Sequence, residues 1–421
     1  MKNLKLFLSL ILVVSINANA SDTLIKNGTI HIGDGSEAFV GDIYIKNGVI
    51  NSIGNLNIKA SIIINAEGKI ITPGFIAPMT AVGIVEIGSL DVTRDDEADY
   101  LNMGFSVFRA FNPNSTLIPW NRSNGLTSAI TLPQQTSMPL AGMGSFFVLD
   151  GKMNVTGMKD MVMLGKMGAS SGSRSEDLDL LENLISLGKL VRNKNYEKVL
   201  ESPIAEFFEL HPQDIEALDK IANKRLPLII ETNRATDIKH LIDIKNKYNL
   251  NLILAGIEDA PLVLNELAQS GIPVIINPMD NIPNSFDELS SSLELASMLN
   301  KAGVTIMFDS ARSHNYHLMR QGAGNAVAYG MKYEDAISGM SKIVADVFGI
   351  KDRGSLVKGN FADIVIWESD PLEPASVPLY VIVEGKQMNL ITRSSRLKDR
   401  YIEKLIKNWV FFLNLYSLNI H

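Results

Sequence analysis

The sequence of 421 residues contains no cysteine. This absence excludes disulfide bonds, thiolate nucleophiles and every Cys-ligated zinc site. Six histidines remain as nitrogen ligands for a metal. The formal net charge is −7 and no dense run of Lys and Arg is present. Nucleic acid is therefore excluded as the main partner, because phosphate binding needs a basic face.

Three further features are missing. The serines near Asp309 and His314 have no G-x-S-x-G sequence around them, so they do not indicate a Ser-His-Asp triad. No glycine-rich phosphate loop follows an early strand, which disfavours a doubly wound nucleotide-binding sheet. No apolar run is long enough to span a bilayer of ~30 Å. A stable membrane anchor is therefore not expected.

The two ends of the chain have their own character. Lys2 and Lys5 precede an apolar run, Leu6–Val14, and Ala18–Ala20 has the small-x-small pattern of a cleavage site. We predict that residues 1–20 are a signal peptide and that the protein is exported to the periplasm. At the other end, residues 396–421 are predicted to form a helical tail. We expect its apolar run, Trp409–Leu413, to pack on the body of the protein.

Short strands with turn residues occur near both ends. In residues 22–70 the tripeptides Lys26–Gly28 and Lys46–Gly48 are predicted hairpin turns, because Asn and Gly tolerate positive φ. Residues 355–395 repeat this pattern, with strands expected at Ala362–Trp367 and Tyr380–Val383. A small β-sandwich assembled from both chain ends is the predicted result.

Residues 71–354 have a different sequence pattern, in which continuous apolar runs alternate with segments that have apolar residues at helical spacing. Runs of this kind are typical of parallel strands buried on both faces. Helices are expected at Thr236–Tyr248 and Ala260–Ser270. The predicted fold class is therefore α/β, with a (β/α)₈ TIM-like barrel. The clearest strands are Pro227–Ile230, Leu252–Ala255, Pro273–Ile276 and Val304–Met307.

Two longer stretches carry a family resemblance. The N-terminal part reads IKNGTIHIGDG, DIYIKNGVINSIG and INAEGKIITPGFI, and the C-terminal part contains GSLVKGNFADIVIW. In these motifs the chain resembles the amidohydrolase superfamily, near its imidazolonepropionase-like branch. The resemblance implies a distorted (β/α)₈ barrel with a small β-sandwich. It also implies hydrolysis of C–N bonds in cyclic amides, ureides or dipeptides by one or two divalent metals, commonly zinc.

The metal ligands that the resemblance implies are largely missing. The His-x-His pair after the first barrel strand falls on Met79 and Ala81, and the histidine of strand 6 falls near Gly256. Glu231 stands where strand 5 carries a histidine. We expect Met79, Ala81 and Gly256 to line the barrel mouth as ligand-binding positions, with no metal and no cofactor bound.

Two ligand positions have a counterpart. Asp309 matches the family's acid at the end of strand 8, and Lys166 is a candidate for the lysine of strand 4. His314 and His317 follow Asp309, and their spacing of three would bring them together on a helix. Asp309, Glu231 and His314 are therefore candidate catalytic residues of a rebuilt zinc site. The alternative is that both histidines are solvated or cap a helix.

Two loops near the predicted mouth each have two interpretations. Gly168–Arg174 is either an anion-binding loop or a simple helix start with Ser175 as its N-cap. Asp91–Glu97 is either a rim of the barrel mouth or a solvated loop.

Two hypotheses of function follow. In the first, the protein is a non-catalytic or weakly active amidohydrolase relative that binds a small ligand or serves beside an active homologue. In the second, it is an active C–N hydrolase with the rebuilt site. A homo-oligomer is compatible with either, since amidohydrolases often assemble.

Overall fold

The computed structural model describes residues 22–134, 138–168, 173–191, 195–310 and 314–417. The predicted signal peptide, residues 1–20, lies outside these described residues. Within them, no helix has both the length and the apolar character needed to cross a bilayer.

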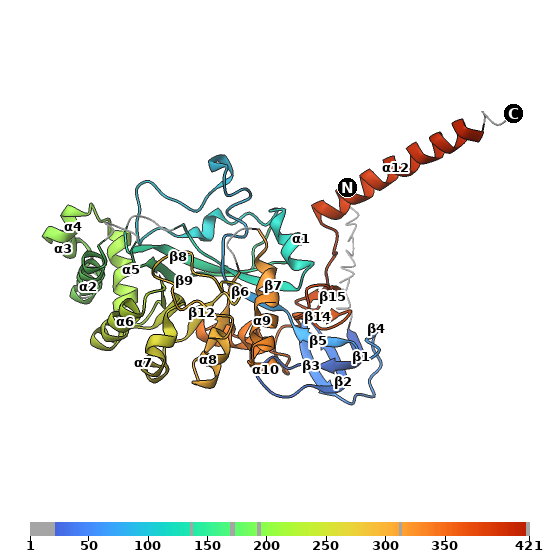
Figure 1. Ribbon diagram of the computed structural model, residues 1–421, viewed down its shortest axis with the longest axis horizontal. Helices are drawn as coiled ribbons and strands as arrows, with labels where there is room; N and C mark the ends of the chain where they lie inside the picture. Colours follow the sequence, from blue (N-terminus) through green and yellow to red (C-terminus); the bar gives the residue numbers. More distant parts are fainter. Residues whose placement is uncertain (1–21, 135–137, 169–172, 192–194, 311–313, 418–421) are drawn as a thin grey trace, which may run out of the picture.

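Eight strands form a nearly closed barrel in which spatial order follows chain order (Figure 1). The fold class predicted from the sequence is therefore confirmed. The strands are β6 (Phe75–Thr80), β7 (Leu126–Thr131), β8 (Leu140–Val148), β9 (Gly157–Lys166), β10 (Leu228–Thr232), β11 (Leu252–Gly256), β12 (Val274–Ile276) and β13 (Ile306–Phe308).

From β9 to β13 the neighbouring strands are parallel, and helices cover their outer side. Every residue of β10 is buried, as expected for a strand with a packed surface on both faces. The helical segments are α2 (Arg174–Leu190), α3 (Glu197–Leu200), α4 (Pro203–Phe207), α5 (Pro212–Ala222), α6 (Ala235–Tyr248), η3 (Ala260–Val263), α7 (Leu264–Ser270), α8 (Leu295–Lys301), η4 (Tyr316–Leu318), α9 (Met319–Ala328), α10 (Tyr333–Gly339) and α11 (Lys342–Val347).

The first part of the barrel departs from the predicted strand–helix alternation. Strand β8 is antiparallel to both β7 and β9. The connections on its two sides, residues 132–139 and 149–156, are shorter than the dozen or more residues that a parallel crossover needs. Among the described residues of this part, helical turns occur only in the connection from β6 to β7: η1 (Asp91–Thr93), η2 (Val107–Ala110) and α1 (Leu117–Arg122).

A second sheet combines both chain ends, as predicted, through the antiparallel pairing of β5 with β14. The side chains that it buries are mainly isoleucines. Its strands are β1 (Thr23–Ile30), β2 (Phe39–Lys46), β3 (Val49–Gly54), β4 (Ile62–Asn65), β5 (Ile70–Pro73), β14 (Ile364–Trp367), β15 (Pro378–Val383) and β16 (Lys386–Gln387).

Of the two predicted hairpin turns, only one is present. Asn47 and Gly48 form the turn between β2 and β3, both with positive φ. Lys26–Gly28 instead lies within β1, where the pairing with β2 shifts register. Asn27 has φ of 56° there, and its backbone N–H donates to Asp42 Oδ1 at 2.9 Å. The prediction was wrong because a strand irregularity needs the same conformational tolerance as a turn.

Arg320 and Trp367 join the barrel to the second sheet. The Trp367 indole N–H donates to Thr72 Oγ1 at 2.9 Å, and its ring packs on Phe75. The buried Arg320 guanidinium lies over this ring and donates to the carbonyls of residues 371, 373 and 376, each at 2.8 Å. These contacts fix the loop after β14 against α9.

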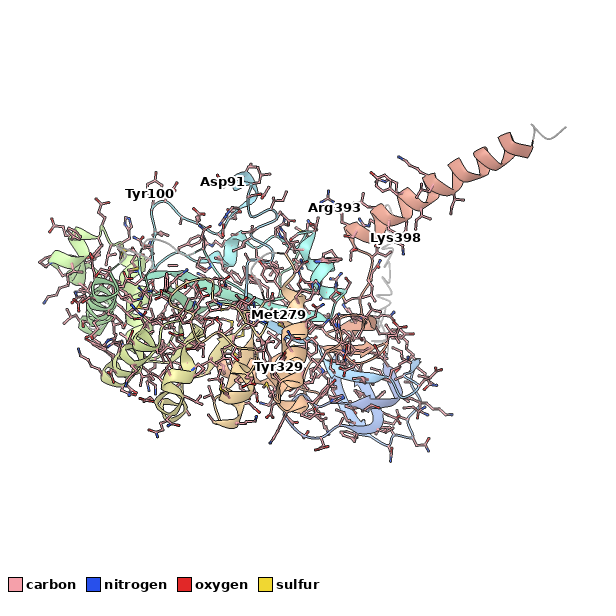
Figure 2. All side chains as sticks on the ribbon, in the orientation of Figure 1. Asp91, Tyr100, Met279, Tyr329, Arg393 and Lys398 are labelled. Carbon is pink, nitrogen blue, oxygen red and sulfur yellow. The ribbon has the colours of Figure 1, made fainter. Side chains whose placement is uncertain are left out.

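Helix α12 (Arg393–Ser417) projects away from the rest of the protein (Figures 1 and 2). The side chains of Tyr401, Ile402, Leu405 and Ile406 are exposed. The helical tail is present. The side chains of its apolar run, Trp409–Leu413, lie outside those that the structure describes, so the expectation that this run packs on the body stays a prediction.

Candidate functional site

Two adjoining cavities, of about 540 and 360 Å³, lie at the ends of the barrel strands and share Met79, Lys166 and Glu231. We call the larger one the acidic chamber; its charged lining residues are Lys166, Arg174, Glu231, Asp237, Glu258, Asp280, Asp287, Glu288 and Asp309. We call the smaller one the apolar chamber; it is lined by Met79, Thr80, Ala81, Arg94, Asp96, Leu132, Pro133, Gln134, Leu164, Lys166, Glu231 and Tyr316.

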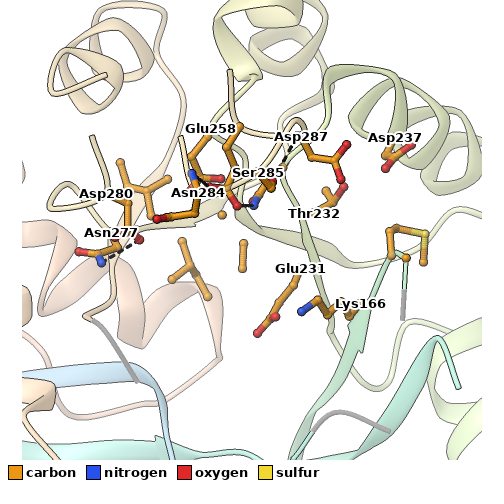
Figure 3. Close-up of a pocket in the computed structure, with 18 of the residues that line it drawn as sticks. Lys166, Glu231, Thr232, Asp237, Glu258, Asn277, Asp280, Asn284, Ser285 and Asp287 are labelled. Atoms are coloured by element: carbon orange, nitrogen blue, oxygen red, sulfur yellow. Dashed lines mark hydrogen bonds between the residues drawn. The ribbon is translucent and has the colours of Figure 1, made fainter. Parts of the chain in front are cut away.

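The structure brings Glu231, Asp309 and Lys166 to the acidic chamber. Lys166 ends β9 and lies in register with Glu231 on β10. Figure 3 shows their side chains pointing toward one another. Asp309 follows β13, and its backbone N–H donates to the carbonyl of Ile276 on the neighbouring strand at 2.9 Å. The strand assignments made from the sequence therefore hold at this end of the barrel.

The three positions of the missing histidines also reach the cavities. Met79 is 5% exposed and contributes to both chambers. Ala81 lines the apolar chamber, where its backbone N–H donates to the Tyr316 hydroxyl at 3.0 Å. Gly256 lines the acidic chamber.

The conformation and surroundings of Gly256 both disfavour a side chain at this position. Its φ is 85°, and a Cβ atom would lie 2.2 Å from Asn233 Oδ1. Both the left-handed conformation and this contact oppose any larger residue. A larger residue at this position would therefore adopt a strained backbone conformation and displace the Asn233 side chain, which binds Glu288.

The candidate histidines do not join this site. His314 Nε2 lies 2.9 Å from the backbone oxygen of Glu86. His317 is buried, with Nδ1 3.1 Å from Asn121 Oδ1 and its ring edge-on to Trp120. Burial, with a smaller effect from Arg320, lowers the pKa of His317 to about 4. The predicted grouping of His314 with Asp309 and Glu231 is therefore not formed at the cavity.

The metal that the family resemblance implies does not fit these residues. Thioether, methyl and glycine groups occupy three of the implied ligand positions. Across the described part of the chain, no group of three or more His, Cys, Asp or Glu residues is placed to hold a metal ion. A catalytic zinc site needs about three protein ligands, so a zinc-dependent hydrolytic site does not fit the described residues of this cavity.

Several carboxylates of the acidic chamber are held by partners. Arg174 Nε donates to Asp237 Oδ2 at 2.8 Å, and the same guanidinium contacts Asp287. Glu288 accepts from Asn233 Nδ2 at 2.8 Å and from the backbone N–H of Asn284 at 3.0 Å. These contacts fix the loop after β12 against the start of α2 and the end of β10.

The two loops with open interpretations also lie here. The N-cap of α2 is Ser173, whose hydroxyl accepts from the Glu176 N–H, so the prediction of Ser175 was wrong by two residues. Residues 169–172 of the proposed anion loop lie outside the described residues. From Asp91–Glu97, Arg94 and the buried Asp96 line the apolar chamber as an ion pair of 2.9 Å. This part of the segment therefore rims the mouth.

Glu258 is the functional candidate that sequence reasoning missed. It is 7% exposed, lines the acidic chamber, and its Oε2 has no hydrogen-bond partner among the described residues. Burial raises its pKa to about 7; a backbone hydrogen bond opposes this shift, and the charges of Glu288, Asp280 and Asp259 add smaller increases. The available signal was its place directly beyond a buried strand, where barrel chemistry is found.

The fold and the cavity place the protein among barrel proteins with a site at the strand ends. Similarity to known proteins indicates the family. The model of the amidohydrolase family matches residues 209–388. Amidohydrolase tasK of Hapsidospora irregularis is 22% identical over 429 residues, which cover 88% of this chain and 43% of that protein. The chain thus spans less than half the length of this relative.

Solved structures agree in fold. An amidohydrolase from Thermotoga maritima MSB8 has a TM-score of 0.76 and 22% identity, over 88% of this chain and 100% of that one. Molinate hydrolase has a TM-score of 0.55 and 14% identity, over 88% and 95%. Residues 209–388 match the model of the amidohydrolase family, and this match supports the relationship predicted for the chain. The imidazolonepropionase-like branch and the loss of the metal pair remain predictions.

Proposed function

We propose that the protein is a non-hydrolytic amidohydrolase relative that binds a small molecule in the two chambers of its barrel mouth. The observation that carries the proposal is Gly256, which offers no side chain to a metal where the family resemblance implies a ligand and whose positive φ disfavours any other residue. Met79 and Ala81 support it, because neither side chain binds zinc in this role. The combined chambers have the size typical of small-molecule sites.

Turnover assays test this proposal directly. Purified protein, with and without added zinc, is offered a panel of cyclic amides, hydantoins and dipeptides. We expect no hydrolysis above background. Turnover that Asp309→Asn or Glu231→Gln abolishes would contradict the proposal, because both residues line the acidic chamber.

One arrangement favours a second candidate, a C–N hydrolase. Glu231, Asp309 and Lys166 line one cavity from three different strand ends, and converging carboxylates are suited to general acid–base work. His314 has no place in this version of the site. The two candidates are separated by the same panel, since only the hydrolase requires Glu231 and Asp309 for product formation.

A further inference from the structure

The acidic chamber has more carboxylates than cations. Its lining includes Glu258, Asp280 and Glu288 on one side, whereas its cations, Lys166 and Arg174, come from β9 and α2. Arg174 is engaged by Asp237 and Asp287. Figure 3 shows Glu258 on the side of the chamber with Asp280, Asn284 and Ser285, away from Lys166.

Glu258 differs from the other acids of this wall in its surroundings. Glu288 is satisfied by Asn233 and by the backbone of Asn284, and Asp280 accepts from Asn277 Nδ2 at 2.9 Å. Glu258 is nine-tenths buried, and its Oε2 has no such donor within the described residues. An ionised carboxylate that is buried without a partner is costly, and an opposite charge offsets that cost.

The neighbouring chamber limits what else the ligand contains. Met79 contributes to both chambers, and beyond it Leu132, Pro133 and Leu164 present apolar surface. A molecule that reaches both chambers therefore meets mainly carboxylates at one end and, at the other, apolar side chains beside the Arg94–Asp96 ion pair.

We propose that Glu258 binds the protonated amine of a small ligand whose apolar part occupies the apolar chamber. This inference rests on the proposed ligand-binding function and assigns the chemical class of the ligand. An anion is disfavoured by the surrounding Glu288, Asp280 and Asp259. A metal ion lacks the donors it needs, because the described residues contain no cluster of three suitable ligands.

Calorimetric titration of the full chain at pH 7 tests the proposal with three matched probes. These are 4-phenylbutylamine, 4-phenylbutanol and 4-phenylbutyrate, which share an apolar body and differ in charge. We expect the amine to bind at least tenfold more tightly than the alcohol, and the carboxylate to bind most weakly. Equal affinity for amine and alcohol, or no amine binding up to 10 mM, would overturn the proposal.

Variants connect the selectivity to Glu258. Glu258→Gln preserves shape and removes the charge, so the amine should lose at least tenfold in affinity while the alcohol is unchanged. Glu266→Gln, on the exposed side of α7, is the matched control and should bind like the wild type. Amine binding that Glu258→Gln leaves intact would refute the role of Glu258.

Proton release gives an independent readout. If the ligand's charge ionises Glu258, titrations at pH 6.5 in buffers of different ionisation enthalpy should show release of a fraction of a proton. The charged groups around it are Glu288, Asp280 and Asp259, with Lys166 and Arg174 farther along the chamber wall. No release in the wild type, or equal release in Glu258→Gln, would contradict the assignment.

These outcomes separate the two proposals. If all three probes bind without preference for the amine, the cavity binds small molecules and only the assignment of Glu258 is wrong. If the turnover panel gives products, the non-hydrolytic function is wrong whatever Glu258 binds.

Discussion

Replacing Glu258 by Gln should stabilise the ligand-free protein at high pH and leave it unchanged at low pH. The carboxyl group is buried in the folded chain, and burial raises its pKa from 4.5 to about 7. Glu258 therefore stays protonated in the folded state between these values, whereas it ionises in the unfolded state. Its contribution to the free energy of unfolding is fully present below pH 4.5 and is lost as the pH rises through 7.

The size of the effect follows from linkage. Each pH unit between the two pKa values is worth about 1.4 kcal/mol, so the full loss above pH 7 is about 3 kcal/mol. Gln is neutral and has nearly the shape of the protonated acid, so the Glu258→Gln variant does not lose this free energy of unfolding as the pH rises. The free energy of unfolding of the variant should exceed that of the wild type by about 3 kcal/mol at pH 8, and the two should be equal near pH 4.5.

Urea unfolding followed by circular dichroism at pH 4.5, 5.5, 6.5 and 8.0 measures this difference. The variant is compared with the wild type at each pH, because His317 also changes the free energy of unfolding in an overlapping pH range. Its contribution rises with pH, whereas that of Glu258 falls. The exposed Glu266→Gln variant is the control. A difference that is the same at every pH, or a variant less stable than the wild type at pH 8, would refute the reasoning.

Three further changes probe the structure around the site. Gly256→Ala should lower the free energy of unfolding by about 2 kcal/mol or more, because of the positive φ and the contact with Asn233. Gly271→Ala, where φ is 65° and no atom lies within 4 Å, should lower it by only about 1 kcal/mol in the same urea unfolding assay. Equal losses for the two variants would contradict this account. Arg320→Met should cost about 3 kcal/mol in urea unfolding, since three carbonyls lose their donor; a loss below about 0.5 kcal/mol would show that these bonds contribute little to stability. The pKa of His317 is about 4 in the folded protein, so the free energy of unfolding should fall as the pH drops from 6.5 to 4. In acid unfolding, His317→Phe should reduce that fall by about 3 kcal/mol. An unchanged dependence on pH would exclude His317 as its source.

The later barrel strands could be predicted from the sequence for a clear reason. Runs such as Pro227–Ile230 are apolar without interruption, and only a strand covered on both faces tolerates that. Once the strands are placed, the rule that barrel sites gather at strand ends brings Glu231, Asp309 and Met79 to one mouth. The structure agrees with all three placements.

Other features depend on contacts that no local pattern contains. Strand β8 runs antiparallel because its connections are short, although its own residues are as buried as those of a parallel strand. Glu258 lines the chamber after two residues of positive φ, Gly256 at 85° and Ile257 at 66°, and no regular strand pattern predicts that course. His314 Nε2 contacts the backbone oxygen of Glu86, which is far away in sequence. Such pairings arise from tertiary structure, so spacing alone misplaces these residues.

Elemental analysis of the purified full chain, after incubation with zinc and removal of free metal, tests the central claim most directly. The claim is that the barrel mouth lacks the donors to hold a catalytic cation. The account predicts far less than one equivalent of any divalent metal per chain. A stoichiometric metal that is lost on Asp309→Asn would contradict it.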